Sequence, residues 1–137
     1  MAAASYTVSS VGFTPQPAPA NFLAHCDDCI AYSTPIGFDF TYFGNTYNKV
    51  HVGANGFAAF DSIPAEGLGG CCEGGVIPSP VSPLDPDNAP YNNLISVFWT
   101  DQNSAARNAD IRYETQGVAP NRKFVVQWNS VPEYFNG

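Results

Sequence analysis

The sequence predicts an all-β fold, an antiparallel β-sandwich or jelly roll. Apolar and polar residues alternate in several short segments, which is typical of strands that bury one face. The 137 residues include 12 Gly and 12 Pro, two residue types that interrupt helices, and runs rich in Ala, Glu, Lys and Leu are missing. Turn signals separate the alternating segments every ~8–12 residues, which is the spacing expected of a sandwich.

The alternating segments define the expected strands in chain order. In the first strand, Phe38, Phe40 and Tyr42 share one face. Residues 44–46 turn the chain, and Asn55-Gly56 predicts a two-residue type I′ hairpin because both residues tolerate positive φ. The predicted strands cover residues 38–43, 47–52, 57–60, 94–99, 111–115 and 123–128. The fourth carries no charge and is expected to be buried.

The length indicates one domain. Residues 1–24 are rich in Pro and Ala and are predicted to form an extended arm, and residues 25–137 a single sandwich domain. Within that domain, Gly and Pro cluster over residues 61–93 and prevent regular strand pairing, so this segment is predicted to be one long loop.

Charge and composition exclude several classes of function. Twelve Asp and Glu against five Lys and Arg give a net charge of −7, which disfavours binding to nucleic acid or to anionic membranes. No apolar stretch approaches the ~20 residues needed to span a bilayer. An even number of cysteines, few Lys and many Tyr, Thr, Asn and Gly favour a secreted, extracellular protein.

Short motifs follow one another in a distinctive order. They are Phe38-Asp39-Phe40, Phe43-Gly44-Asn45-Thr46-Tyr47, Val50-His51-Val52, Asn55-Gly56-Phe57, Phe98-Trp99-Thr100-Asp101, Ile111-Arg112-Tyr113 and Ala119-Pro120-Asn121-Arg122-Lys123-Phe124-Val125-Val126-Gln127-Trp128. From residue 36 to about residue 135, this order resembles the nidogen-like (NIDO-type) extracellular domain, especially its versions in large bacterial secreted and surface proteins.

The resemblance implies a secreted β-sandwich without catalytic apparatus, associated with matrix, adhesion or surface assembly. In similar domains, further strands follow a segment like Val131-Pro132 and complete the sheet. This chain is therefore expected to lack its last strands or to receive the missing pairing from elsewhere.

The four cysteines are Cys26, Cys29, Cys71 and Cys72, and they allow three disulfide connectivities. Structural disulfides are favoured over a zinc site and over free thiols, because adjacent cysteines chelate poorly and the second Cys-x-x-Cys of a zinc ribbon is missing. We expect two cross-links between the 26/29 and 71/72 loops. Closing loops of ~45 residues stabilises a fold by roughly 3–4 kcal/mol.

Oxygen-bearing side chains in the predicted loops could bind calcium. They are Asp27, Asp28, Asp85, Asp87, Asn88, Asp101 and Asp110. The Gly and Glu of an EF-hand are missing, so solvated carboxylates and no bound cofactor are the default expectation. If calcium binds, the candidate ligands are Asp85, Asp87, Asn88 and Asp101.

The sequence predicts no enzyme. His25 and His51 are the available near-neutral bases, and neither lies in a recognisable catalytic motif. Aromatic residues in loops or at ends could stack on a sugar or anchor a protein interface, although packing under a loop is the simpler role. These residues are Tyr32, Tyr91, Tyr134 and Phe135.

The favoured function is a non-enzymatic extracellular structural or adhesion module that contacts other copies of itself or other extracellular proteins. In its sharper form, the chain is a self-assembling subunit of a surface filament or matrix. Tyr6, Thr7 and Val8 alternate in polarity and are predicted to add as a strand to a neighbouring copy. The alternatives are a carbohydrate- or calcium-dependent binding module and an accessory domain of a larger secreted protein.

Overall fold

The computed structural model describes residues 8–10, 12, 14–23, 26–60 and 93–134. In these ranges it contains seven strands and no α-helix, which confirms the all-β prediction. The strands are β1 (Asn21–Phe22), β2 (Ile30–Tyr42), β3 (Asn45–Gly53), β4 (Phe57–Ala59), β5 (Leu94–Ser96), β6 (Asp110–Gln116) and β7 (Lys123–Asn129). No described segment forms a helix that is long and apolar enough to cross a membrane.

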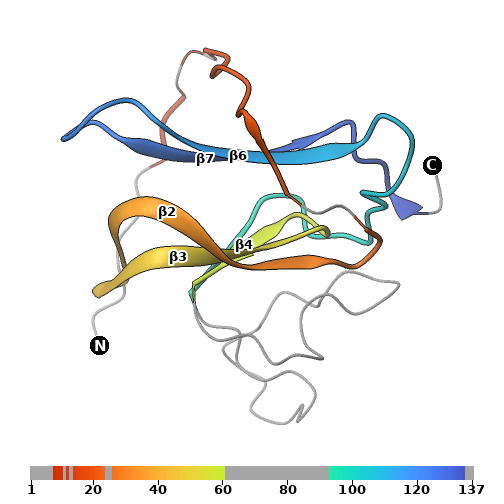
Figure 1. Ribbon diagram of the computed structural model, residues 1–137, viewed down its shortest axis with the longest axis horizontal. Helices are drawn as coiled ribbons and strands as arrows, with labels where there is room; N and C mark the ends of the chain where they lie inside the picture. Colours follow the sequence, from red (N-terminus) through yellow and green to blue (C-terminus); the bar gives the residue numbers. More distant parts are fainter. Residues whose placement is uncertain (1–7, 11, 13, 24–25, 61–92, 135–137) are drawn as a thin grey trace, which may run out of the picture.

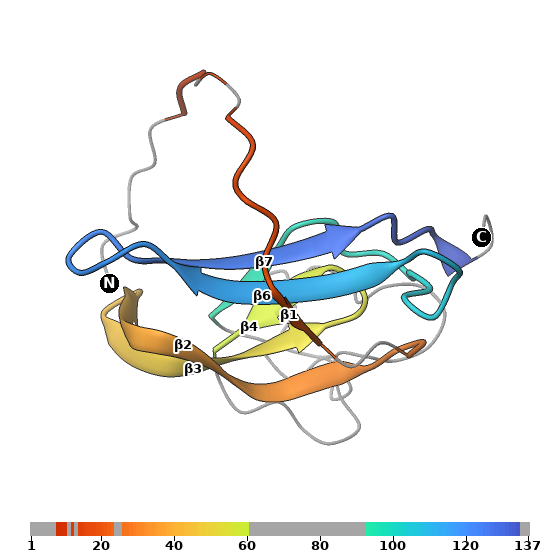
Figure 2. The ribbon, with the colours of Figure 1, turned by 45° about the horizontal axis from the view of Figure 1, so that its top comes forward.

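The strands form two antiparallel sheets that lie face to face (Figure 1). One sheet has the order β1-β6-β7 and the other the order β2-β3-β4-β5. Figure 2 shows the two layers from a second direction, with β1 next to β6 in the first of them. The arrangement confirms the predicted β-sandwich.

The inner faces of both sheets supply the core. Ile36, Val50, Val52 and Ile111 are each at most 2% exposed, and the alternating aromatic residues of β2 and β7 pack around them. A smaller cluster is centred on Phe57, which is fully buried. The period-two pattern read from the sequence therefore identifies the buried face correctly in β2 and β3.

The first hairpin turns one residue earlier than expected. Tyr42 pairs with Asn45, so the loop consists of Phe43 and Gly44 alone, with φ of 47° and 82°. Two successive positive φ values define a type I′ turn, whose twist matches that of the flanking strands.

The second hairpin differs from the predicted type I′ turn at Asn55-Gly56. Gly53 pairs with Phe57, so the loop has three residues, of which Gly56 has a positive φ of 78°. Such a loop ends in a left-handed residue that forms a bulge. Asn55 is 1% exposed because its side chain bonds to the protein interior, and this leaves the left-handed conformation to Gly56.

Two strands differ in length from the prediction. β2 begins at Ile30 rather than residue 38, and its register shifts before Thr34 and before Phe40 interrupt the alternation that the sequence pattern relies on. β5 ends at Ser96, and the following Val97 and Phe98 are 63% and 62% exposed, so the expectation of a buried strand over residues 94–99 is wrong. The amides of Val97 and Phe98 both donate to the carbonyl of Gly56, which takes the chain out of the sheet.

The N-terminal segment joins the sandwich before residue 24. β1 pairs with β6, the Leu23 amide donates to the Ile111 carbonyl at 2.9 Å, and Leu23 is buried. The described part of the arm that precedes β1 is exposed except at Pro19, and it rises away from the layers in Figure 2. Residues 21–23 therefore belong to the domain and not to the arm.

Candidate functional site

An apolar cleft lies between the two sheets. It has a volume of about 450 Å³, and its walls are aromatic and aliphatic side chains of β2 and β7, including Phe38, Phe40, Phe124 and Val126. Hydrogen bonds join the two sheets beside the cleft, because Arg122, which lines it, donates to the Gly37 carbonyl at 2.9 Å and Thr115 donates to the carbonyl of Ile36. The cleft is thus a region that the two sheets leave incompletely filled.

The cleft opens beside the last strands of the two sheets. Ile95 and Val97 line it and are 40% and 63% exposed, so solvent reaches it along β5. Among the described residues, β5 pairs with β4 alone and β7 with β6 alone. Each thus presents one edge of backbone N–H and C=O groups that can pair with a further strand.

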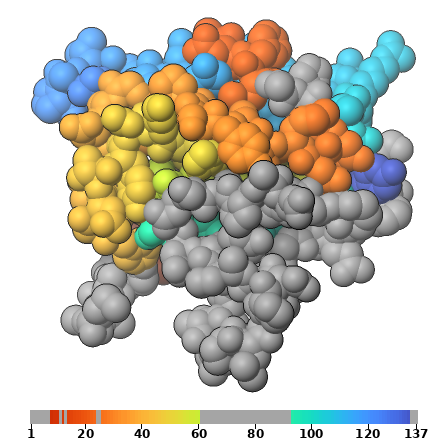
Figure 3. Space-filling view, turned by 60° about the horizontal axis from the view of Figure 1, so that its bottom comes forward, coloured from red at the N-terminus to blue at the C-terminus, as the bar shows by residue number. Residues whose placement is uncertain are grey.

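The outer face of the four-stranded sheet carries polar and charged side chains, unlike the apolar cleft. Figure 3 shows it with the side chains of β2 in orange and of β3 in yellow. His51 lies here with an edge-on contact to the Tyr32 ring, and its Nδ1 accepts a hydrogen bond from the Ser33 amide at 3.3 Å. Asp39 and Lys49 line the same shallow hollow. The ring is thus engaged as a neutral acceptor.

We expect His51 to contribute to the pH dependence of the free energy of unfolding. Burial lowers the pKa of His51 below its ordinary value of 6.5. The unfolded chain therefore binds a proton before the folded chain does, so stability is lost as the pH falls below about 6.5. We expect His51→Gln to remove this component in urea unfolding measured between roughly pH 7.5 and 5. Parallel pH profiles for the two proteins would contradict this assignment.

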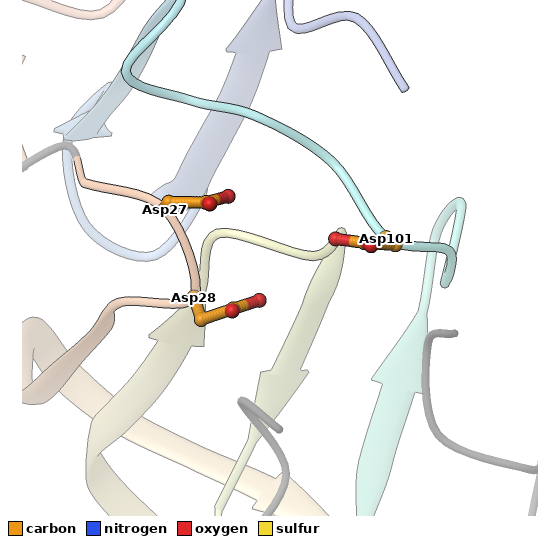
Figure 4. A group of neighbouring side chains, drawn as sticks. All are labelled: Asp27, Asp28 and Asp101. Carbon is orange, nitrogen blue, oxygen red and sulfur yellow. The ribbon is translucent and has the colours of Figure 1, made fainter. Parts of the chain in front are cut away.

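Three carboxylates meet at one end of the sandwich. Asp27 and Asp28 form a turn before β2, and Asp101 lies in the loop after β5. One oxygen of each residue lies within 4.8 Å of the others, and Figure 4 shows the three side chains pointing into a common space. We call these residues the acidic cluster.

A disulfide closes the turn that carries two of these carboxylates. Cys26 pairs with Cys29 across a Cα–Cα distance of 5.3 Å, and Asp28 inside this turn has a positive φ of 58°. This pairing corrects the expected cross-links of Cys26 and Cys29 to the 71/72 loop. The tight turn brings the two Cα atoms within the usual disulfide range, so Cys26 and Cys29 can pair with each other without a distant partner.

Buried polar side chains hold the acidic cluster together. Asn55 Nδ2 donates to Asp28 Oδ1 at 2.9 Å, and Asn55 Oδ1 accepts from the Gln102 amide at 2.8 Å. Ser104, which is fully buried, donates to the Cys26 carbonyl at 2.7 Å. The two loops that carry the carboxylates are thus joined twice by side chains that are shielded from solvent.

The electrostatic environment disfavours three ionised carboxylates. Burial, and then Asp28 and Asp27, raise the pKa of Asp101 above its ordinary value, and burial and Asp28 raise that of Asp27. None of the described Lys and Arg residues forms an ion pair with the cluster. Asp110 instead forms an ion pair with Arg112 at 2.9 Å and lies outside the cluster.

The structure brings together only some of the residues that the sequence marks. Asp101, Asp27 and Asp28 converge, and Val8 is 95% exposed. The residues that fall outside the described ranges are Tyr6, Thr7, His25, Cys71, Cys72, Asp85, Asp87, Asn88, Tyr91 and Phe135. The sequence reading did not mark Asn55 or Ser104 as site residues, since amide and hydroxyl side chains are common in turns.

The fold and these surfaces define a small β-sandwich domain. The model of the NIDO-related family matches residues 4–137, so the chain belongs to the NIDO-related family. This confirms the NIDO-type domain inferred from the motifs. No curated protein and no solved structure matches the chain significantly.

Proposed function

We propose that this chain is a non-enzymatic extracellular structural or adhesion module that acts through protein–protein contacts, and that copies assemble by adding a strand to the open side of the sandwich. The observation that carries the proposal is the apolar cleft beside two strand edges, β5 and β7, that are free within the described chain. Family membership supports the extracellular setting.

The chemistry of the cleft and of the adjoining free edge of β7 favours an added strand as the occupant. The edge of β7 offers backbone hydrogen bonds, and the adjoining cleft offers an apolar volume for every second side chain of an added strand. Phe98, which follows the cleft residue Val97 and is 62% exposed, extends this apolar surface beyond the cleft. Exposed apolar surface next to a free edge is typical of a pairing site.

The charges of the two edges also favour pairing. Lysine on an edge strand commonly blocks unwanted association, yet β5 carries no charged residue and β7 carries one cation, Lys123, at its first position. The Lys123 ammonium is engaged with Gln16 Oε1 at 3.4 Å. Most of the β7 edge is therefore without electrostatic protection.

The donor we propose is the segment Tyr6–Val8 of a second copy. It alternates in polarity, and its last residue, Val8, is 95% exposed. The arm that follows is held to its own domain at Gln16 and Pro17, which contact the β6–β7 hairpin, and then by β1. A segment that precedes an arm anchored in this way can reach a neighbour without unfolding its own domain.

Deleting the arm tests the donor. We expect the full chain to assemble with rising concentration in sedimentation velocity, and a chain lacking residues 1–20 to remain monomeric and folded, because β1 begins at Asn21. A chain lacking residues 1–5 keeps the donor segment and is the matched control that should still assemble. A monomeric full chain at high concentration would overturn the proposal.

A second pair of variants tests the acceptor. Val97→Lys places a charge beside the cleft, whereas Val118→Lys places one in the β6–β7 turn, where Val118 is 79% exposed and lies outside the cleft. Both side chains are exposed, so neither change should alter folding by more than about 0.5 kcal/mol. We expect assembly to be lost in the first variant and kept in the second. Equal assembly of the two would exclude the cleft as the acceptor.

A further inference from the structure

We propose that Asp27, Asp28 and Asp101 bind one calcium ion, which clamps the disulfide-closed turn before β2 to the loop after β5. The site lies at an end of the sandwich, and its argument is independent of the assembly proposed above. It rests on the geometry of the three carboxylates and on the low exposure of Asp101, whose carboxylate has no partner among the described residues.

The spacing of the oxygens suits a single large cation. Ca²⁺ binds oxygen at roughly 2.3–2.6 Å, so two ligands on opposite sides of one ion lie about 5 Å apart. The three carboxylates approach one another within 4.8 Å, and their side chains point into the same space in Figure 4. All three can therefore contact one ion without rearrangement of the backbone.

Asp101 supplies the second and independent observation. It is 6% exposed, and no described residue donates a hydrogen bond or an ion pair to its carboxylate. Proteins commonly compensate a closely enclosed carboxylate that has no protein partner by metal coordination. Asp27 and Asp28 face it with the same charge, so they increase the cost of its ionisation rather than offset it.

The surrounding side chains orient the ligands. Asn55 holds Asp28 by one amide atom and the Gln102 backbone by the other, and Ser104 fastens the Cys26 carbonyl. These residues act as positioning residues, since they fix the two loops at the separation the ion requires. Pre-arranged ligands lower the cost of ordering a site when the ion binds.

The donor set selects calcium among common cations. The cluster offers carboxylate oxygens alone, which suit calcium or magnesium, whereas zinc prefers nitrogen or thiolate ligands, and both neighbouring cysteines are consumed in a disulfide. Magnesium demands strict octahedral geometry and keeps several waters. Carboxylates on two separate loops, one of them closely enclosed, fit the flexible coordination of calcium better.

The test uses the full chain after treatment with EDTA. We expect isothermal titration with calcium chloride to give one site per chain, with a Kd of roughly 0.1–1 mM, the range of extracellular modules. At about ten times that concentration the melting temperature should rise by about 5 °C. The same concentration of magnesium chloride should give a clearly smaller rise. Absence of any calcium response up to about 10 mM would overturn the site.

Variants locate the ion. Asp101→Asn keeps the shape of the side chain and removes the buried charge, so in EDTA it should melt at or above the temperature of the wild type and should no longer respond to calcium. Asp27 is exposed, so Asp27→Asn should fold normally and bind calcium at least about tenfold more weakly. Asp110→Asn, whose carboxylate pairs with Arg112 outside the cluster, is the matched control that should keep the response. An unchanged response in both cluster variants would place the ion elsewhere and overturn the assignment.

Discussion

Replacing Gly56 by Ala is expected to destabilise the fold by roughly 3–5 kcal/mol, because two penalties add. Gly56 has a φ of 78°, a conformation that side chains rarely adopt. A Cβ at this position would also lie 2.2 Å from the Phe98 carbonyl oxygen and 2.6 Å from Gln102 Nε2. The backbone atom cannot move aside cheaply, since the Phe98 amide is itself bonded to the Gly56 carbonyl.

Gly44→Ala is the matched control for Gly56→Ala. Gly44 has nearly the same φ, 82°, yet nothing lies within 4 Å of the position its Cβ would take. Its substitution therefore reports the backbone penalty alone, about 1–2 kcal/mol. The difference between the two variants in urea unfolding measures the close approach of the 98–102 loop, and equal losses would show that this approach is absent in solution.

Gly56→Ala should also disturb the acidic cluster and weaken its calcium binding. The carbonyl of Gly56 accepts from the amides of Val97 and Phe98, and these residues begin the loop that carries Asp101. An added methyl group pushes this loop away from the turn at Asp27 and Asp28. Where the variant remains folded, we expect a reduced calcium response, whereas Gly44→Ala should respond like the wild type.

The strands that the sequence predicted best are those whose signals are local. β6 and β7 were expected over 111–115 and 123–128 and lie at 110–116 and 123–129, because strand-forming residues flank a clear turn signal that begins at Gly117. The early part of β2 escaped prediction for the opposite reason. Ser33 and Gly37 adopt positive φ there, and the register shifts beside them break the period of two.

The surfaces of functional interest depend on residues that are far apart in the chain. Asp27, Asp28 and Asp101 each read as a loop oxygen donor, but nothing local indicates that the last of them meets the other two. That meeting depends on the buried side chains of Asn55 and Ser104, which bridge the two loops. The cleft depends on how far the two sheets separate beside β5 and β7, a distance that strand patterns do not encode.

Phe57→Ala is expected to cost roughly 3–5 kcal/mol, because a fully buried ring is replaced by a cavity. The ring packs against Gly53 of the neighbouring strand. A Cβ at Gly53 would stand 2.1 Å, 2.3 Å and 2.7 Å from three of its carbon atoms. Gly53→Ala should therefore cost about 1–3 kcal/mol through overpacking, although alanine is otherwise harmless in a strand.

The two changes together should cost less than the sum of their separate effects. With Phe57 truncated, the methyl group of alanine at position 53 meets empty space instead of the ring, and it fills part of the cavity. A coupling free energy of about 1–3 kcal/mol is expected from urea unfolding of the wild type, both single variants and the double variant. Because a loss of this size approaches the stability of many domains, Phe57→Leu provides a milder version of the same cycle. Additive losses in both cycles would contradict the contact, since independent sites do not share a cavity. A coupling of the expected size would show why residue 53 is glycine, since the Phe57 ring of β4 packs directly on the backbone of β3 at this position.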